Sequence, residues 1–214
     1  MDIYTIENEE TARVGEEPCE ALFPERMKKA RRYLRYEDRL MCMGAGLLLT
    51  CCAGEREADI SLNKYGKPYS RSGRFFSLSH SDGCAAIAFG GSELGTDIEG
   101  ISSENLKLAP FVFCPEEREW IKADPPERFY RLWSIKESIL KAAGLGMSVE
   151  PVSLCVDPET DSLAFDGRIW YYRSAVWKNR SVAAACSEPF SELHIVPLDA
   201  AVIMRLIRNG PLQI

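Results

Sequence analysis

Two carboxylates in the segment GTDIEG could hold a divalent cation. Asp97 and Glu99 are two residues apart, and on a β-strand this spacing points both side chains to one face while Ile98 points to the other, into the core. Oxygen ligands of this kind suit Mg²⁺, which usually takes further ligands from phosphate. A solvated strand face explains most isolated Asp-x-Glu pairs, so a metal site requires further residues of the same chemistry.

A helical segment about forty residues later carries such residues. Trp133, Glu137 and Lys141 are four residues apart and form one stripe of the helix, with Lys136 beside it. Glu137 could complete a site of three carboxylates or act as a base, and Lys141 could neutralise phosphate oxygens. Alternatively, Glu137 and Lys141 form a surface ion pair, which stabilises a helix by ~0.2–0.5 kcal/mol, and Trp133 belongs to the core. Another side of the helix can face the core through Ile135, Ile139 and Ala142.

Two other groups of residues could bind anions. A basic run in PERMKKARRYLRYEDR consists of Arg26, Lys28, Lys29, Arg31, Arg32, Arg35 and Arg39. A solvated helix face, a nucleotide phosphate site and a dock for an acidic partner all fit this run. Further on, a Gly-Pro loop carries Lys64 and Lys67, and a strand ends in Ser79-His80-Ser81. The hydroxyls there could bind phosphate or merely cap a turn.

The elements that position these residues follow from the hydrophobic pattern. Helices are predicted over 24–52, with a break near Tyr36, over 115–123 and over 129–143, where Gly144 ends the helix. Strands are predicted at 2–6, three times within 74–100 between Asp-Gly and Gly-Gly turns, and at 152–156, 169–177, 181–187 and 193–197. Residues 64–73 form a loop by their Gly, Pro and Ser content.

The repeated order of a long helix followed by strands indicates an α+β fold of two similar halves. DGCAAIAFGG and NRSVAAACSE are counterparts in this reading, although chance resemblance between Ala-rich strands explains them about as well. The expected halves are residues 1–100 and 101–214, each a long helix on a small, mostly antiparallel sheet, with the active site in the cleft between them.

Composition and charge restrict the function classes. The chain of 214 residues is 46% hydrophobic and 27% charged, as in ordinary globular proteins. A net charge of −6 argues against general binding to nucleic acid or an anionic membrane. No apolar run approaches the ~20 residues of a membrane-spanning helix, and the acidic start MDIYTIENEE lacks the pattern of a signal peptide. A cytoplasmic location is therefore expected.

The eight cysteines are expected to be reduced and mostly buried. Without a C-x-x-C pair, and with only two histidines in the chain, the sequence argues against a structural zinc site. Most of them lie in apolar stretches, where a free cysteine behaves as a small hydrophobe. They are Cys19, Cys42, Cys51, Cys52, Cys84, Cys114, Cys155 and Cys186.

Taken in order, these motifs resemble the 4′-phosphopantetheinyl transferases, in their larger single-chain class. The two signatures are the G-x-D-x-E strand and the W-x-x-K-E-x-x-x-K helix, and the resemblance runs from about residue 24 to residue 156. The matching residues are Lys67, Pro68, Ser79, His80, Ser81, Gly95, Asp97, Glu99, Trp133, Lys136, Glu137, Lys141 and Gly144.

The resemblance implies a monomer of two pseudo-symmetric α+β halves that binds coenzyme A in the cleft between them. As a holo-acyl-carrier-protein synthase, it would move the phosphopantetheine arm of coenzyme A to a serine of an apo acyl or peptidyl carrier protein, with Mg²⁺, and release adenosine 3′,5′-bisphosphate. Such carriers serve fatty acid, polyketide and nonribosomal peptide synthesis. The sequence names neither the carrier nor the pathway, and it leaves open whether acylated coenzyme A is accepted.

The resemblance also implies a role for each matching residue. Asp97, Glu99 and Glu137 would surround Mg²⁺, and Glu137 would be the base for the carrier serine. Lys141, Ser79 and Lys67, next to Pro68, would hold the diphosphate. His80, Arg26 and Lys29 would meet the 3′-phosphate. Glu117 aligns with an acidic residue near the metal.

One departure and two rival functions accompany this resemblance. An arginine common in the class would fall near Met41, and Arg39 is two residues away, ~200° around a helix. A hydrolase of coenzyme A-like diphosphates would use the same chemistry without a carrier. A non-catalytic carrier-binding homologue would show a damaged carboxylate triad, whereas all three carboxylates are present.

Overall fold

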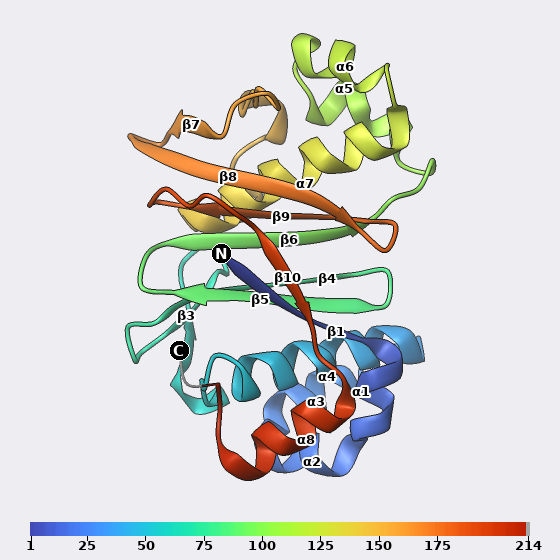
Figure 1. The fold of residues 1–214 in the computed structure, drawn as a ribbon, viewed down its shortest axis with the longest axis vertical. Coiled ribbons are helices and arrows are strands. Elements are labelled where there is room, and N and C mark those ends of the chain that lie inside the picture. The colour runs from blue at the N-terminus through green and yellow to red at the C-terminus, as the bar shows by residue number, and fades with distance from the viewer. Residues whose placement is uncertain (213–214) are drawn as a thin grey trace.

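Two four-stranded sheets lie between two groups of helices in the computed structural model, which describes residues 1–212 (Figure 1). The first sheet has the order β10-β1-β5-β4, in which β1 and β10 are parallel and the other pairs antiparallel. Its strands are β1 (Asp2–Glu7), β4 (Phe75–Ser81), β5 (Cys84–Gly90) and β10 (His194–Pro197).

The second sheet is antiparallel throughout and has the order β6-β9-β8-β7. Its strands are β6 (Leu94–Gly100), β7 (Ser162–Phe165), β8 (Arg168–Trp177) and β9 (Arg180–Cys186). A separate antiparallel hairpin pairs β2 (Ile60–Leu62) with β3 (Pro68–Ser70).

Helices cover the outer face of each sheet (Figure 1). On the side of the first sheet lie α1 (Asn8–Val14), α2 (Glu16–Leu22), α3 (Pro24–Ala30), α4 (Tyr36–Cys51) and α8 (Ala200–Asn209). On the side of the second lie α5 (Ala109–Val112), α6 (Pro115–Ile121) and α7 (Pro125–Ala143). Short 3₁₀ turns are η1 (Glu57–Asp59), η2 (Leu106–Leu108), η3 (Gly146–Ser148) and η4 (Pro151–Ser153). Among residues 1–212, no helix combines the length and the apolar content needed to cross a membrane.

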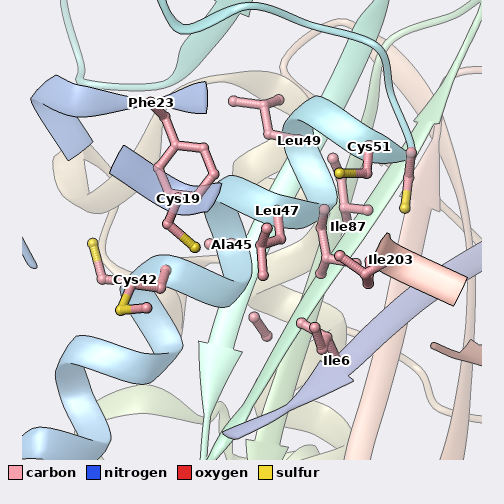
Figure 2. Close-up of a cluster of buried hydrophobic side chains, with 14 of the residues drawn as sticks. Ile6, Cys19, Phe23, Cys42, Ala45, Leu47, Leu49, Cys51, Ile87 and Ile203 are labelled. Atoms are coloured by element: carbon pink, nitrogen blue, oxygen red, sulfur yellow. The ribbon is translucent and has the colours of Figure 1, made fainter. Parts of the chain in front are cut away.

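Three apolar clusters hold these layers together. Figure 2 shows the cluster under the first sheet, where Leu47 of α4, Ile87 of β5 and Ile203 of α8 meet. Small residues such as Ala86 and Ala184 fill the space between the two sheets. The third cluster packs α7 on β8 and β9, and it contains the three residues predicted to face the core, Ile135, Ile139 and Ala142.

The α+β class and the mostly antiparallel sheets are confirmed, but the chain divides at other places than residue 100. Strand β6 belongs to the second sheet because it pairs with β9, and β10 and α8 return to the first sheet and its helices. The predicted break in the first helix lies at residues 31–35. The strand predicted at 152–156 is wrong: residues 151–153 form a 3₁₀ turn that starts at a proline. The predicted loop 64–73 contains β3.

Candidate functional site

Strand β6 presents two carboxylates on the side where β4 and α7 meet it. Asp97 accepts a hydrogen bond from Ser79 and Glu99 accepts one from Ser81, while Ile98 is fully buried between the sheets. The predicted alternation along this strand is therefore confirmed. Asp97 is only 2% exposed, and a carboxylate buried to this extent requires compensating partners.

Helix α7 can lie directly against β6 because residue 95 is a glycine. A Cβ atom there would be 2.0 Å from the carbonyl oxygen of Ser138 and 2.5 Å from the amide nitrogen of Ala142. Any side chain would thus push the helix away from the strand. The glycine in GTDIEG brings Lys141 and Glu137 within reach of the carboxylates.

Lys141 supplies the positive charge closest to Asp97. Its Nζ lies 2.6 Å from Asp97 Oδ1 and 3.0 Å from Ser79 Oγ, and Ser79 donates to the same Oδ1 at 2.8 Å. The second oxygen of Asp97, Oδ2, is buried without a hydrogen-bond partner among residues 1–212. Leaving a buried acceptor unsatisfied is costly, so this oxygen is available to a bound cation.

Glu99 is held from both sides and is short of positive charge. Ser81 donates to Oε2 at 2.9 Å, and the indole Nε1 of Trp133 donates to Oε1 at 3.3 Å. Burial, and next the charge of Asp97, raise the pKa of Glu99 to about 7. Trp133 therefore orients the carboxylate of Glu99. The sequence offered only a helix stripe or the core as places for this tryptophan and did not indicate this role.

Glu137 faces the same carboxylates from α7. Burial raises its pKa, the charge of Asp97 raises it further, and Lys141 partly opposes the shift. Together with Lys141 it lines a cavity of about 200 Å³ between α7, β4 and the turn at residues 65–68. Three carboxylates here share one close ammonium group, which leaves excess negative charge. Oxygen ligands with excess negative charge and one unpartnered buried oxygen fit a divalent cation such as Mg²⁺.

Basic residues predicted to bind phosphate lie near one another at the end of β4. His80 keeps part of its surface in solvent, but the atoms packed around it desolvate its ring, and this desolvation, with the charges of Lys141, Lys29 and Arg26, lowers its pKa. The charges of Arg26 and Lys29, both on α3, therefore act on His80 together with the charge of Lys141. This arrangement offers one region for a cation and an adjacent region for anions.

Comparison with known proteins shows the family to which a chain with this site belongs. The sequence profile of the 4′-phosphopantetheinyl transferase superfamily matches residues 93–187. A 4′-phosphopantetheinyl transferase of Bacillus subtilis is 31% identical over 175 residues, which is 75% of this chain and 78% of that protein. The chain belongs to the 4′-phosphopantetheinyl transferase superfamily.

Two further members of the superfamily show similar coverage. The 4′-phosphopantetheinyl transferase ffp of Bacillus subtilis is 31% identical over 157 residues, or 68% of each chain. The 4′-phosphopantetheinyl transferase HetI of Nostoc sp. is 28% identical over 178 residues, or 75% of each chain. The superfamily profile starts just before β6 and ends just after β9, so it contains the carboxylates of both β6 and α7.

Lys67 of this transferase is already engaged within the protein. Its Nζ donates to the carbonyl oxygens of Leu94 at 3.2 Å and Ala142 at 3.0 Å, and burial lowers its pKa to about 8. Asn63 of the same turn donates to the carbonyl oxygen of Gly144 at 2.7 Å. Lys67 therefore fastens the β2–β3 hairpin to the end of α7, whereas the sequence predicted a diphosphate ligand. Pro68 lines the cavity beside it.

Glu117 does not lie at the carboxylate site, contrary to the expected alignment. It forms a fully buried ion pair with Lys136 at 2.6 Å and accepts the amide hydrogens of Cys114 and Val156, both at 2.8 Å. Lys136 also donates to the carbonyl oxygens of Val112 and Pro151. Its pKa is lowered by burial, with Glu117 opposing the shift. Both residues thus tie α7 to the segments around it.

Arg39, the nearest candidate for the arginine expected near Met41, already makes a hydrogen bond within the protein. Its Nε donates to the carbonyl oxygen of Tyr33 at 2.8 Å, so this part of the guanidinium stabilises the start of α4.

Not all eight cysteines are free. Cys114 and Cys155 form a disulfide across 41 residues, which corrects the expectation of reduced thiols throughout. The other six are free and buried, as predicted. No spacing signal connects Cys114 with Cys155, because only the fold brings α6 next to residue 155.

Proposed function

We propose that this chain transfers the 4′-phosphopantetheine arm of coenzyme A to a serine of an apo acyl or peptidyl carrier protein in a Mg²⁺-dependent reaction. Adenosine 3′,5′-bisphosphate is the second product. The observation that carries the proposal is the group of Asp97, Glu99 and Glu137 around the ammonium of Lys141, with Asp97 Oδ2 lacking a hydrogen-bond partner among residues 1–212.

Asp97, Glu99 and Glu137 are the residues that would hold the cation. Bound Mg²⁺ would withdraw charge from the diphosphate and so make its phosphorus more open to attack. Ser81 and Trp133 keep the two oxygens of Glu99 in place, so this ligand needs little reorganisation. Preorganised ligands of this kind favour catalysis by positioning and charge neutralisation, which dominate transfers of phosphoryl type.

The remaining roles follow from charge and position. Lys141 lines the cavity and can hold the diphosphate, with Ser79 beside it. His80, Arg26 and Lys29 form the adjacent basic region and can bind the 3′-phosphate. Glu137 has a raised pKa, which suits a group that accepts a proton near neutral pH.

These groups account for each bond and proton that changes in the proposed reaction. The serine oxygen of the carrier forms a bond to the phosphorus that bears the pantetheine arm, and the bond from this phosphorus to the bridging diphosphate oxygen breaks. The serine proton passes to Glu137. The bridging oxygen leaves with adenosine 3′,5′-bisphosphate, whose charge Lys141 offsets.

A cytoplasmic monomer that binds neither nucleic acid nor membranes fits this proposal. The net charge of −6 supports the exclusion of nucleic acid and anionic lipid. Light scattering of the purified protein would test the monomeric state.

Intact-mass spectrometry of an apo carrier protein tests the proposal. The carrier is incubated with this protein, coenzyme A and Mg²⁺, and the gain of one phosphopantetheine arm is followed in time. Glu137→Gln removes the proposed base with little change in shape. Glu127→Gln, in the first turn of the same helix, is the matched control.

We expect the wild type and Glu127→Gln to modify the carrier, and Glu137→Gln and a metal-free sample to fail. Cleavage of coenzyme A without a carrier product would instead support the hydrolase. Coenzyme A left intact across acyl and peptidyl carriers would support a non-catalytic homologue. Running acyl-coenzyme A in parallel would decide whether the thiol end has an open path.

A further inference from the structure

A second group of possible metal ligands lies at the N-terminal side of α6, away from the carboxylate site. The sulfur atoms of Cys114 and Cys155 and a carboxylate oxygen of Glu116 all lie within 4.8 Å of one another. In the oxidised protein the two sulfurs form a disulfide with a Cα–Cα distance of 5.9 Å. Asp157 lines the same surface cavity as Glu116 and Cys155.

Access distinguishes this cysteine pair from the other cysteines. Cys155 is exposed, whereas Cys114, its disulfide partner, and the six free cysteines are buried. Burial raises the pKa of Cys19 and Cys84 to about 12, so these thiols are poor metal ligands near neutral pH. Among residues 1–212, the disulfide at α6 is therefore the cysteine site that a thiol in solution and a metal ion can reach, through exposed Cys155.

We propose that reduction of the Cys114–Cys155 disulfide creates a Zn²⁺ site formed by the two thiolates and Glu116. Two equivalents of a small thiol give their hydrogen atoms to the two sulfurs and leave as their own disulfide. Zn²⁺ then displaces both thiol protons. Zinc–sulfur bonds of ~2.3 Å in tetrahedral geometry place two thiolates roughly 3.8 Å apart, a distance that side-chain rotation can reach from the present Cα positions. Asp157 or water completes four ligands.

The two forms of this site connect the same segments. Val156, next to Cys155, and Cys114 both donate their amide hydrogens to Glu117, which pairs with Lys136. A disulfide between these segments, or a metal ion bound by both, keeps the donors close to Glu117. The protein thus has a covalent link under oxidising conditions and a metal link under reducing ones, and both protect the buried ion pair behind α7.

Cobalt spectroscopy of the reduced, full-length protein tests the proposal. The protein is reduced with a phosphine, freed of reductant under nitrogen and titrated with Co²⁺, whose thiolate complexes absorb by charge transfer in the near ultraviolet. Carboxylates at Asp97, Glu99 and Glu137 cannot give this band. Cys155→Ser removes one thiolate and Glu116→Gln removes the carboxylate. Glu119→Gln, an exposed glutamate of the same helix, is the matched control.

With excess Mg²⁺ present to occupy the carboxylate site, we expect one equivalent of Co²⁺ to give the band in reduced wild type and in Glu119→Gln. Cys155→Ser should lose the band, and Glu116→Gln should bind at least about tenfold more weakly, since even indirect partners of a metal contribute that much. With the same excess of Mg²⁺ occupying the carboxylate site, Zn²⁺ should also raise the melting temperature of the reduced wild type more than that of the oxidised protein. Absence of the band in reduced wild type would overturn the proposal. An unchanged band in Cys155→Ser, or equal affinity in Glu116→Gln and Glu119→Gln, would do the same.

Discussion

Helix α7 carries two lysine–carboxylate pairs that look alike by distance and differ in their surroundings. Lys136 lies 2.6 Å from Glu117, and Lys141 lies 2.6 Å from Asp97. The first pair is 0% and 1% exposed, while Lys141 retains 27% of its side-chain surface beside a cavity. Glu117 has a partner for both of its oxygens. In the part of the chain that the structure describes, Asp97 has hydrogen-bond partners for Oδ1 but none for Oδ2.

This difference separates a structural ion pair from a pair available for ligands. The protein around Lys136 and Glu117 supplies enough donors and acceptors, so nothing further needs to bind there. Around Lys141 and Asp97 the protein adds two more carboxylates, which increases the imbalance of charge. An incomplete set of partners at a buried charge is therefore the more useful sign of a functional site than the presence of an ion pair.

Removing the charge of Asp97 should have the largest effect on transfer. We expect Asp97→Asn to lower kcat/KM by ~10²–10³-fold or more, comparable to the loss of one group that stabilises charge in a transition state. Its melting temperature should change little, because the substitution also relieves repulsion among the carboxylates. Holo-carrier formation by mass spectrometry and thermal unfolding would measure the two effects. If Asp97→Asn had wild-type activity, the Lys141–Asp97 pair would be no more important for transfer than the Lys136–Glu117 pair.

Breaking the buried Lys136–Glu117 pair should instead reduce stability. Glu117→Ala leaves Lys136 buried without its counter-charge, and we expect a loss of ~3–5 kcal/mol in the free energy of unfolding. Urea unfolding measures this loss. Lys136→Met combined with Glu117→Leu removes both charges and should recover much of it. If Glu117→Ala unfolded at the same urea concentration as the wild type, the pair would not be the structural link described here.

The support of Glu99 should affect metal affinity more than stability. Ser81→Ala removes the hydrogen bond to Oε2, and a partner of this kind is worth ~10–100-fold in metal affinity. Calorimetric titration with Mg²⁺ should show weaker binding in Ser81→Ala than in Ser103→Ala, a control at an exposed serine. Equal affinities would show that Ser81 does not position Glu99.

Glu99, next to the Lys141–Asp97 pair, should also make Mg²⁺ binding depend on pH. In the metal-free protein the pKa of Glu99 is raised to about 7, so below pH 7 the metal must displace a proton. We expect affinity to fall with decreasing pH by up to ~tenfold per unit for one displaced proton. Since the folded state binds this proton more tightly than the unfolded state, the contribution of Glu99 to stability falls as pH rises through the same range. Affinity independent of pH between 5 and 7 would contradict this.

The sequence alone was sufficient to predict much of the site around Lys141 and Asp97. The period of two around Ile98 and the period of four from Trp133 to Lys141 identified the faces on which these side chains lie. The roles of Gly95 and Gly144 can also be inferred from the sequence. The close approach of α7 to Gly95 and the left-handed end of α7 at Gly144 both require glycine. These features are local in the chain.

What the sequence did not reveal depends on distant contacts. Lys136 in a helical pattern suggests a surface charge, and only the packing of α6 and residues 151–156 shows that it is buried. The disulfide joins residues 41 positions apart. Lys67 was expected to bind phosphate from the family resemblance. Nothing in the sequence near it indicates that its ammonium instead donates to the carbonyl oxygens of Leu94 and Ala142. The return of β10 and α8 to the first sheet is likewise absent from any local pattern.

The most direct test of the central claim compares Asp97→Asn and Glu117→Gln under conditions in which both are folded. Single-turnover formation of holo-carrier, with coenzyme A and saturating Mg²⁺, would be followed by intact mass. We predict that Glu117→Gln transfers the arm at a rate near that of the wild type despite its lower stability, whereas folded Asp97→Asn transfers almost none. Transfer by Asp97→Asn at the wild-type rate would contradict the assignment of the site.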